Sequence, residues 1–458
     1  MTETTATPID VPETFASAFR GSLVRPDDGD YDETRRVHNG LIDKRPGLIA
    51  RCATTEDVVT AVNLARDRGV ELSVRGGGHS VAGRAVTEGG LMIDLSLMRS
   101  THVDPAAGTA SAEGGVTWRE LDEATHDHGL MTPGGVVSST GIAGLTLGGG
   151  LGWTQGRFGL TVDNLLAAEI VTADGAVLTA TKTEHPDLFW ALRGGGGNFG
   201  IVTRFTYRTH PLDTVLGGTV VYPVADALSV LETYRDVTAH APDELSLQAA
   251  LFCVPDGSGT RAAGLSVCHC GNNPTEADAA VAPLRHVTTP LRDLVARIPY
   301  PVKNSQTDVM FPRLARNYWK QAFVDRLTDE ILETLVEARA TCPSDMTVVV
   351  VEQVHGAATR VPVGATAFPY RKEGYAVLLC GQWLDPADDE ANIAWTRTTY
   401  QRLAPHLGTR RYVNYMSADD AGPQVAQAYG PNYARLREAK RRYDPANLFR
   451  LNQNIDPA

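Results

Sequence analysis

The sequence predicts an α+β protein of two domains, the second built on an antiparallel sheet covered by helices. Three observations predict this fold class. The 458 residues exceed what one hydrophobic core usually organises. Glycine clusters are concentrated between residues 76 and 200 and vanish between about 214 and 404. In that central stretch, strand-like segments alternate with helical ones, as in an α+β domain.

The chain opens as a small α/β unit. Residues 48–52 are expected to form a strand, and 55–68 carry apolar residues at helical spacing before Gly69, a suitable C-cap. A second strand at 71–74 runs into the loop Arg75-Gly-Gly-Gly-His79-Ser80. Consecutive glycines allow positive φ angles and a close approach of the backbone to a ligand. This loop is therefore a candidate ligand site with an imidazole at its end.

Further strands and helices follow in order. Residues 90–95 are expected to form a strand, and the capping-box spacing of Thr117 and Glu120 opens a helix that ends near Gly129. A second glycine-dense block runs from 133 to 153. Because glycine costs roughly 1 kcal/mol per helical position relative to alanine, we attribute this density to contact with a flat or polyanionic ligand. Residues 166–180 then predict a hairpin with its turn at Asp174-Gly175.

A third glycine block contains Gly195-x-Gly197-x-x-Gly200, which formally matches the dinucleotide-binding fingerprint. The residues after it, 201–207, alternate and are β-branched, whereas that fingerprint requires a helix. The sequence therefore excludes a Rossmann domain here. Beyond His210 the expected strands are 245–253, 263–270, 346–354 and 375–383, with a helix over 328–340 and a last helix closing at Tyr443.

Charge and cysteine content exclude several function classes. There are 42 basic and 54 acidic residues, for a net charge of −12, and no block of five basic residues suggests a nucleic-acid or membrane partner. No apolar run approaches the roughly 18 to 20 residues needed to span a bilayer. Six scattered cysteines and a start without the segments of a secretion signal predict a cytoplasmic protein. Cys268-His269-Cys270 lies in an alternating run without a second ligand cluster, so no metal is expected.

With these motifs the chain resembles the vanillyl-alcohol-oxidase (PCMH-type) family of FAD flavoproteins. Within that family it resembles the berberine-bridge-enzyme-like branch, which includes 6-hydroxynicotine oxidases. The resemblance covers about 20–455. It rests on the segments 74–80, 133–135, 141–153, 159–164, 187–200, 412–415, 443–449 and 452–455. It implies an FAD-binding domain over 13–213, to which 405–458 returns, and a substrate-binding domain over 214–404.

In this family the histidine of the first glycine loop, here His79, is joined covalently to the 8α-methyl of the flavin. Many relatives add a cysteine link four residues before the position of Gly141, where this chain has Val137. A single covalent link to FAD, which would raise the flavin potential, is therefore expected. The positions implied to bind FAD are His79, Arg75, Gly76, Gly77, Gly78, Ser80, Pro133, Gly134, Gly135, Ser138, Ser139, Thr140, Gly141, Gly144, Gly148, Gly149, Gly150, Gly152, Trp153, Asn164, Gly200, Ile201, Val202, Tyr412, Asn414 and Asn452.

The resemblance also points to the catalytic groups. Relatives pair a residue of the strand before Gly356 with the end of segment 412–415, which here gives Gln353 and Tyr415. Tyr415, held by Gln353, is the expected base, although a phenol of pKa near 10 needs nearby positive charge and this strand supplies none. Glu352 and His355 remain alternatives. Thr140 matches the position that controls oxygen access to the flavin and is small enough to leave it open.

The expected function is an FAD-dependent oxidase. It would remove a hydride from an alcohol or amine carbon of a small secondary-metabolite or alkaloid-type substrate and pass electrons to O₂, giving H₂O₂. One alternative is an oxygenase that acts on a polyketide-like or aromatic substrate through a flavin-oxygen adduct. Another is a flavin-storing or ligand-sequestering protein. The central segment has the weakest motifs, so the substrate itself is not predicted.

Overall fold

The computed structural model describes residues 8–458; the first residues of the chain, on which the cytoplasmic expectation partly rests, lie outside this range. Its N-terminal part is a four-stranded sheet in the order β1-β2-β4-β3, in which β2, β4 and β3 run parallel. The elements are α1 (Glu13–Ala18), β1 (Ser22–Val24), α2 (Tyr31–Thr34), β2 (Leu48–Arg51), α3 (Thr55–Arg68), β3 (Leu72–Arg75) and β4 (Leu91–Asp94). α3 begins at a capping box of Thr54 and Asp57 and ends at Gly69, as predicted.

A five-stranded antiparallel sheet in the order β5-β6-β10-β8-β9 follows. Its strands are β5 (Thr101–Asp104), β6 (Thr109–Glu113), β8 (Leu165–Val171), β9 (Val177–Thr181) and β10 (Ile201–Arg208). Around it lie α4 (Trp118–His126), β7 (Leu130–Met131), α5 (Ile142–Gly148), α6 (Gln155–Phe158), α7 (Thr161–Asn164), α8 (Pro186–Leu192) and β11 (His210–Pro211). Because strand β10 begins directly after Gly200, the exclusion of a Rossmann domain is confirmed.

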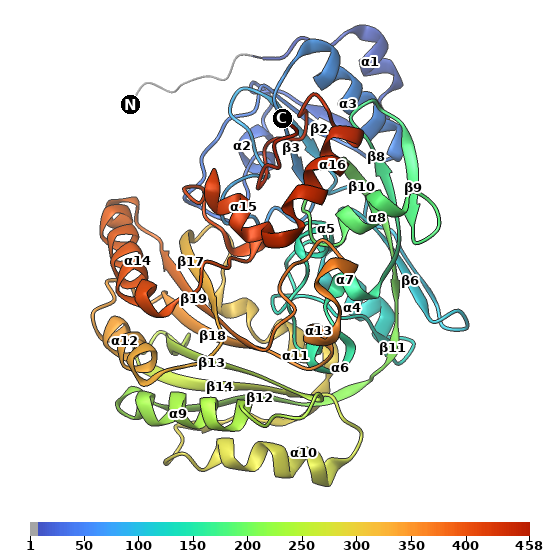
Figure 1. Ribbon diagram of the computed structural model, residues 1–458. Coiled ribbons are helices and arrows are strands. Elements are labelled where there is room, and N and C mark those ends of the chain that lie inside the picture. The colour runs from blue at the N-terminus through green and yellow to red at the C-terminus, as the bar shows by residue number, and fades with distance from the viewer. Residues whose placement is uncertain (1–7) are drawn as a thin grey trace.

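The third sheet is eight-stranded and antiparallel, in the order β15-β12-β14-β13-β18-β19-β17 with β16 beside β12. Its strands are β12 (Thr214–Pro223), β13 (Leu245–Cys253), β14 (Arg261–His269), β15 (Arg292–Asp293), β16 (Ala296–Pro299), β17 (Arg316–Val324), β18 (Val348–Val354) and β19 (Gly374–Trp383). The helices of this part are α9 (Ala227–Thr238), α10 (Pro274–Val281), α11 (Tyr300–Ser305), α12 (Asp329–Ala340), α13 (Ala357–Arg360) and α14 (Asp389–Leu403). Helices α9, α12 and α14 lie along one side of the sheet and share its core (Figure 1). The predicted α+β class, with an antiparallel sheet covered by helices, is confirmed.

The end of the chain returns to the N-terminal part. Helices α15 (Pro423–Tyr429) and α16 (Tyr433–Tyr443) lie beside the early elements of the chain (Figure 1). The ammonium of Lys440, wholly buried in α16, donates to Asp444 at 2.7 Å and to the carbonyl of Asn198 at 2.8 Å. Phe449 joins the core of the first sheet. The domain limits at 213, 214–404 and 405 stay a prediction, and every strand of the largest sheet falls inside 214–383.

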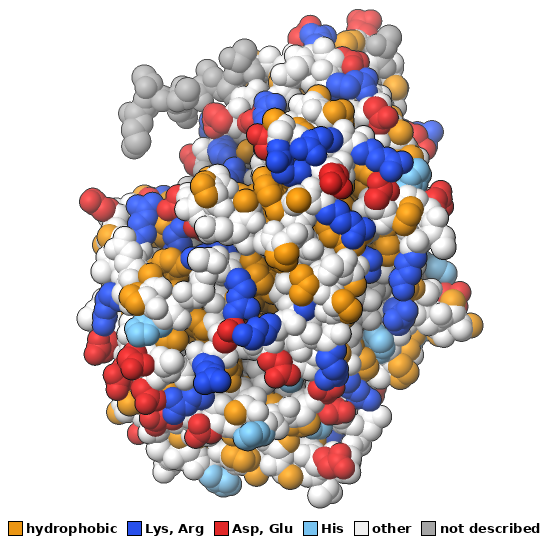
Figure 2. Space-filling view, in the orientation of Figure 1, with side chains coloured by type: hydrophobic (Ala, Val, Ile, Leu, Met, Phe, Trp, Pro, Cys, Tyr) orange, Lys and Arg blue, Asp and Glu red, His pale blue; other side chains and the backbone are white. Residues whose placement is uncertain are grey.

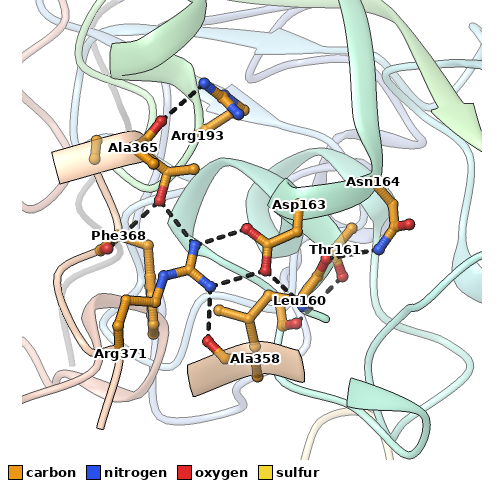
Figure 3. Close-up of polar contacts among 12 residues, drawn as sticks. Leu160, Thr161, Asp163, Asn164, Arg193, Ala358, Ala365, Phe368 and Arg371 are labelled. Atoms are coloured by element: carbon orange, nitrogen blue, oxygen red, sulfur yellow. Dashed lines mark hydrogen bonds and ion pairs between the residues drawn. The ribbon is translucent and has the colours of Figure 1, made fainter. Parts of the chain in front are cut away.

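One buried ion pair joins the central segment to the glycine-rich half. Arg371, whose side chain is 1% exposed, donates to both oxygens of Asp163 at 2.7 and 2.8 Å and also to the carbonyl of Ala358 and the hydroxyl of Thr366 (Figure 3). Asp163 in turn accepts from the backbone N–H of Leu160 at 2.9 Å. Both oxygens of Asp163 and both terminal nitrogens of Arg371 are thus hydrogen-bonded, which offsets the cost of burying the two charges; the Nε of Arg371 has no partner among residues 8–458. This contact fixes how the two parts meet.

On the face drawn in Figure 2, the distribution of charged side chains agrees with the charge analysis of the sequence. Lys and Arg side chains are interspersed with Asp and Glu there, without a large patch of one sign (Figure 2). Within residues 8–458, no helix is long and apolar enough to cross a membrane. All six cysteines are buried and free. The cytoplasmic location stays a prediction.

Candidate active site

A cavity of about 570 Å³ lies where the first glycine loop, α5, the C-terminal segment and one face of the large sheet meet. This volume lies within the range usual for cofactor and ligand sites. The predicted site residues that line it are His79, Gly76, Gly77, Gly78, Ser80, Thr140, Gly141, Gly144, Glu352, Tyr412, Asn414, Tyr415 and Asn452. Residues from four distant stretches of the chain thus meet at one cavity.

His79 is held on two sides. Its ring stacks on that of His38, with centroids 3.7 Å apart and planes 24° apart, and its Nε2 lies 3.0 Å from the hydroxyl oxygen of Ser139. The backbone N–H of His38 donates to the carbonyl of Gly78 at 3.0 Å, which holds this residue beside the glycine loop. Burial, and to a lesser degree the neighbouring His38, hold the pKa of His79 well below its usual value. His79 is therefore a neutral, oriented imidazole with Nδ1 not engaged by Ser139.

The cavity wall has features that fit a large polar cofactor. A Cβ atom added at Gly144 or Gly197 would meet no other atom within 4 Å, so the bare backbone faces open space. The side-chain carbonyl oxygens of Asn452 and Gln453 are buried there without a hydrogen-bond partner. The Nε of Arg84, another lining residue, also lacks one. Buried polar atoms rarely stay unpaired, so these groups fit the hydroxyl, amide and diphosphate groups of FAD.

Other glycines of the motifs have a structural reason instead. Gly77 and Gly141 approach so closely that a Cβ atom on either would collide with the backbone of the other. A Cβ atom at Gly148 would collide with the side chain of Asn414, and one at Gly152 with the carbonyl of Gly134. The attribution of glycine density between 133 and 153 to ligand contact alone is therefore wrong. Some of these glycines let α5 and its flanking loops pack against the first glycine loop, the C-terminal segment and one another.

Several predicted FAD-binding residues do not line the cavity. These are Arg75, Pro133, Gly134, Gly135, Ser138, Ser139, Gly148, Gly149, Gly150, Gly152, Trp153, Asn164, Gly200, Ile201 and Val202. The guanidinium of Arg75 donates to both oxygens of Asp94 at 2.9 and 2.6 Å. The Ser138 hydroxyl bonds Asp308 at 2.6 Å, and the Asn164 amide bonds two carbonyls of its own turn. Their contacts support the loops rather than the cavity.

Trp153 is the clearest of these cases. Its indole is 1% exposed and packs with Met131, Cys268 and Tyr300. The ammonium of Lys303 lies 3.6 Å from the centre of its ring, a cation–π contact. Trp153 is therefore buried between the glycine-rich half and the large sheet and does not line the cavity.

The expected pairing of Tyr415 with Gln353 is also wrong. Tyr415 donates to the two carboxylate oxygens of Glu352 at 3.3 and 3.2 Å. Gln353 points to the opposite face of β18, where its amide donates to the carbonyl of Thr238 in α9 at 2.9 Å. Successive strand residues face opposite sides, so only one of Glu352 and Gln353 can reach the cavity. Gln248 completes the cluster, donating to Glu352 at 2.9 Å.

The electrostatics of this cluster favour the carboxylate as the proton acceptor. Burial raises the pKa of Glu352 to about 7, although the hydrogen bond from Tyr415 lowers it. Burial and the adjacent Glu352 raise the pKa of Tyr415 well above its usual value, so the phenol keeps its proton. His355, the other alternative, does not line the cavity, and burial lowers its pKa.

The segment 412–415 is anchored against α5. The N–H of Gly150 donates to the hydroxyl oxygen of Tyr412 at 2.8 Å, and the amide of Asn414 donates to the same oxygen and to the carbonyl of Leu145. These bonds fix the position from which Tyr415 reaches Glu352. Val137 and Thr140 both line the cavity.

Sequence reasoning missed several lining residues, namely His38, Asn39, Arg84, Gly196, Gly197, Gln248, Tyr429 and Gln453. For Gly196 and Gly197 the third glycine block was a usable signal, and Gln453 adjoins the predicted Asn452. His38 and Gln248 carry no signal of this kind, since only folding brings them to His79 and Glu352.

Two known domain families match the chain. The FAD binding domain matches residues 46–181, and the berberine and berberine-like domain matches 411–456. (R)-6-Hydroxynicotine oxidase of Paenarthrobacter nicotinovorans is 31% identical over 96% of this chain and 97% of its own length. An uncharacterized FAD-linked oxidoreductase of Bacillus subtilis is 31% identical over 95% of this chain and 97% of its own length.

Solved structures extend the comparison. 6-Hydroxy-D-nicotine oxidase of Arthrobacter nicotinovorans superposes with a TM-score of 0.85 at 28% identity, covering 96% of this chain and 98% of that one. A berberine bridge enzyme variant in complex with (S)-reticuline gives 0.86 at 21% identity, covering 98% and 100%, which shows the fold. Fold, cavity and domain matches define an FAD-linked oxidoreductase. The chain belongs to the berberine-bridge-enzyme-like branch of the PCMH-type FAD flavoproteins, so the resemblance found in its motifs is confirmed.

Proposed function

We propose that this oxidoreductase is an oxidase that takes a hydride from an alcohol or amine carbon of a small secondary-metabolite or alkaloid-type substrate. One observation carries the proposal: a buried carboxyl, Glu352, faces the same cavity as His79 and has a pKa of about 7. Bound FAD would accept the hydride and pass the electrons to O₂, giving H₂O₂. The protein's own residues have to orient the substrate and accept its proton.

Glu352 is the proposed proton acceptor. A base works best when its pKa lies near the working pH, because it is then deprotonated and still basic enough to take a proton. Tyr415 and Gln248 each donate to its carboxylate and so hold it in place. Tyr415, with its raised pKa, is a positioning residue in this scheme. Gln353 has no part in it.

His79 is the proposed covalent attachment point. A nucleophilic imidazole must be neutral, and burial favours that state. With Nε2 at Ser139, Nδ1 is the nitrogen left for the bond. Val137 has no sulfur with which to form a second link. Mass spectrometry of the tryptic peptide containing His79 tests this point: the expected mass includes one flavin, and an unmodified peptide from flavin-loaded protein would refute it.

Thr140 is proposed to leave a path for oxygen, because it is small and lines the cavity. The fate of oxygen tests the whole proposal. Stoichiometric peroxide during turnover supports the oxidase, whereas ¹⁸O in the product with little peroxide supports the oxygenase alternative. Anaerobic incubation with a panel of alcohols, cyclic amines and polyphenols, followed by flavin absorbance, finds the substrate class. A flavin that no compound bleaches would favour a storage role.

A further inference from the structure

Four polar side chains form a row across the large sheet. In register, Thr219 of β12 lies opposite Ser266 of β14, Ser266 opposite Gln248 of β13, and Gln248 opposite Glu352 of β18. Residues directly opposite one another on paired strands point to the same face. All four line the cavity. The row thus begins at the proposed base and runs away from it along the cavity wall.

The next row along the strands is apolar over its five central positions, with Arg292 opposite Val221 at one end and Gln321 opposite Leu378 at the other. These five positions are Val221, Gly264, Ala250, Val350 and Leu378, matched by the same registers. Trp319 and Phe311 also line the cavity, with ring centroids 5.7 Å apart. A flat apolar wall with polar groups in a single row suits a planar ring system whose polar atoms lie along one edge.

Two members of the row, Ser266 and Thr219, lie beyond Gln248 as seen from Glu352, and Ser266 has the more unusual hydrogen bonds. Its oxygen accepts from the ammonium of Lys303 at 2.8 Å and from the hydroxyl of Thr219 at 3.3 Å. Among residues 8–458, the proton of Ser266 itself is donated only to the carbonyl of Gly218 at 3.5 Å, at the limit of a hydrogen bond. The Ser266 hydroxyl can therefore donate into the cavity.

Lys303 gives this hydroxyl a positive neighbour. It is wholly buried, and within residues 8–458 no carboxylate lies at salt-bridge distance from it. Burial lowers its pKa to about 8, so it remains mostly charged at pH 7. A buried cation without a counter-ion costs free energy unless it is stabilised, and the Trp153 ring stabilises it only in part. A negative or strongly accepting oxygen near Ser266 would complete its environment.

We propose that Ser266, backed by Lys303, is a second substrate anchor, and that the substrate is a planar fused-ring aromatic compound with an acceptor oxygen, phenolate or carbonyl, at that end. This rests on the proposed function, which puts the oxidised alcohol or amine at Glu352. Ser266 and Glu352 are two strand spacings apart, or about 10 Å. A molecule that reaches both needs two or three fused six-membered rings.

A matched pair of probes tests the anchor. Binding of 2,7-dihydroxynaphthalene and of 2-naphthol to the flavin-loaded protein is measured by anaerobic calorimetry at pH 7. The two probes differ by one hydroxyl, so the ratio of their Kd values reports the second anchor. We expect the wild type to bind the diol about tenfold more tightly, as for a charge-assisted hydrogen bond. Ser266→Ala should bring the ratio close to one, and Lys303→Met should also reduce it.

Ser246→Ala is the matched control. Ser246 lies on the same strand face as Gln248, two residues away, but outside the cavity, so its loss should leave the ratio unchanged. A wild type without preference for the diol overturns the anchor, as does a ratio that persists in Ser266→Ala. The measurement needs no turnover. A failed proposed function, seen as a flavin that no compound reduces, is therefore distinguishable from a failed anchor.

Discussion

Replacing Glu352 by Gln keeps the shape of the side chain and removes its ability to take a proton. General-base catalysis typically contributes 10²–10⁴-fold, and we expect flavin reduction at saturating substrate to slow by about that factor. Gln can still accept from Tyr415 and Gln248, so the positions of its neighbours should survive. The change therefore isolates the proton transfer.

The pKa of Glu352 sets the pH dependence. Since burial raises it to about 7, the active carboxylate should be present at about half at pH 7 and at about a tenth at pH 6. The rate of flavin reduction in the wild type should thus rise through pH 7 and level off above pH 8. Tyr415→Phe removes a bond that lowers this pKa, so its profile should move to higher pH.

Anaerobic stopped-flow absorbance between pH 5.5 and 9 measures these rates with any substrate found in the panel. Gln353→Leu is the control, because this neighbouring residue faces α9 and should leave the profile where it is. A Glu352→Gln variant that keeps its rate within tenfold of the wild type would refute the assignment. So would a Tyr415→Phe variant that loses more than Glu352→Gln, which would return the base role to the phenol.

Further expected outcomes concern stability and the cofactor. The folded-state pKa of Glu352 lies above its usual 4.5, so the wild type loses stability as pH rises from 4.5 to 7. In urea unfolding, Glu352→Gln should therefore be more stable than the wild type by roughly 3 kcal/mol at pH 8 and should differ little from it at pH 4.5. His79→Ala should release all its flavin on acid precipitation; flavin kept in the pellet would point to another attachment residue. Arg371→Met leaves the buried Asp163 unpaired and should cost about 3–5 kcal/mol, whereas Arg442→Met, at an exposed pair with Asp187, should barely change Tm. Thr140→Leu should slow reoxidation by O₂ without slowing anaerobic reduction, and an unchanged reoxidation rate would remove Thr140 from oxygen access.

Local patterns predicted much of the fold correctly. Strand β13 spans the predicted 245–253, α12 lies within 328–340, and Gly69 caps α3. These elements depend on alternation, helical spacing and cap residues, which are written in neighbouring positions. The same holds for the strand after Gly200, which excluded the Rossmann domain.

Some residues of the candidate site could likewise be predicted from local patterns, and others could not. The glycine loop with His79, the glycine motif around Thr140 and the strand with Glu352 are each readable in the sequence. The partner of Tyr415 was not, because Glu352 and Gln353 are neighbours and only the packing of α9 decides which of them faces the cavity. Trp153 was assigned to the cofactor, yet α11 brings Lys303 onto its ring.

The sequence by itself therefore determined the family, the α+β class, the cofactor type and the histidine at the glycine loop. Tertiary structure alone decided that Glu352 and not Gln353 meets Tyr415, that His38 stacks on His79, and that Thr219, Ser266, Gln248 and Glu352 form one row. The physical reason is that strand pairing and burial join residues far apart in the chain. Such contacts set hydrogen-bond partners and pKa values, and no local pattern encodes them.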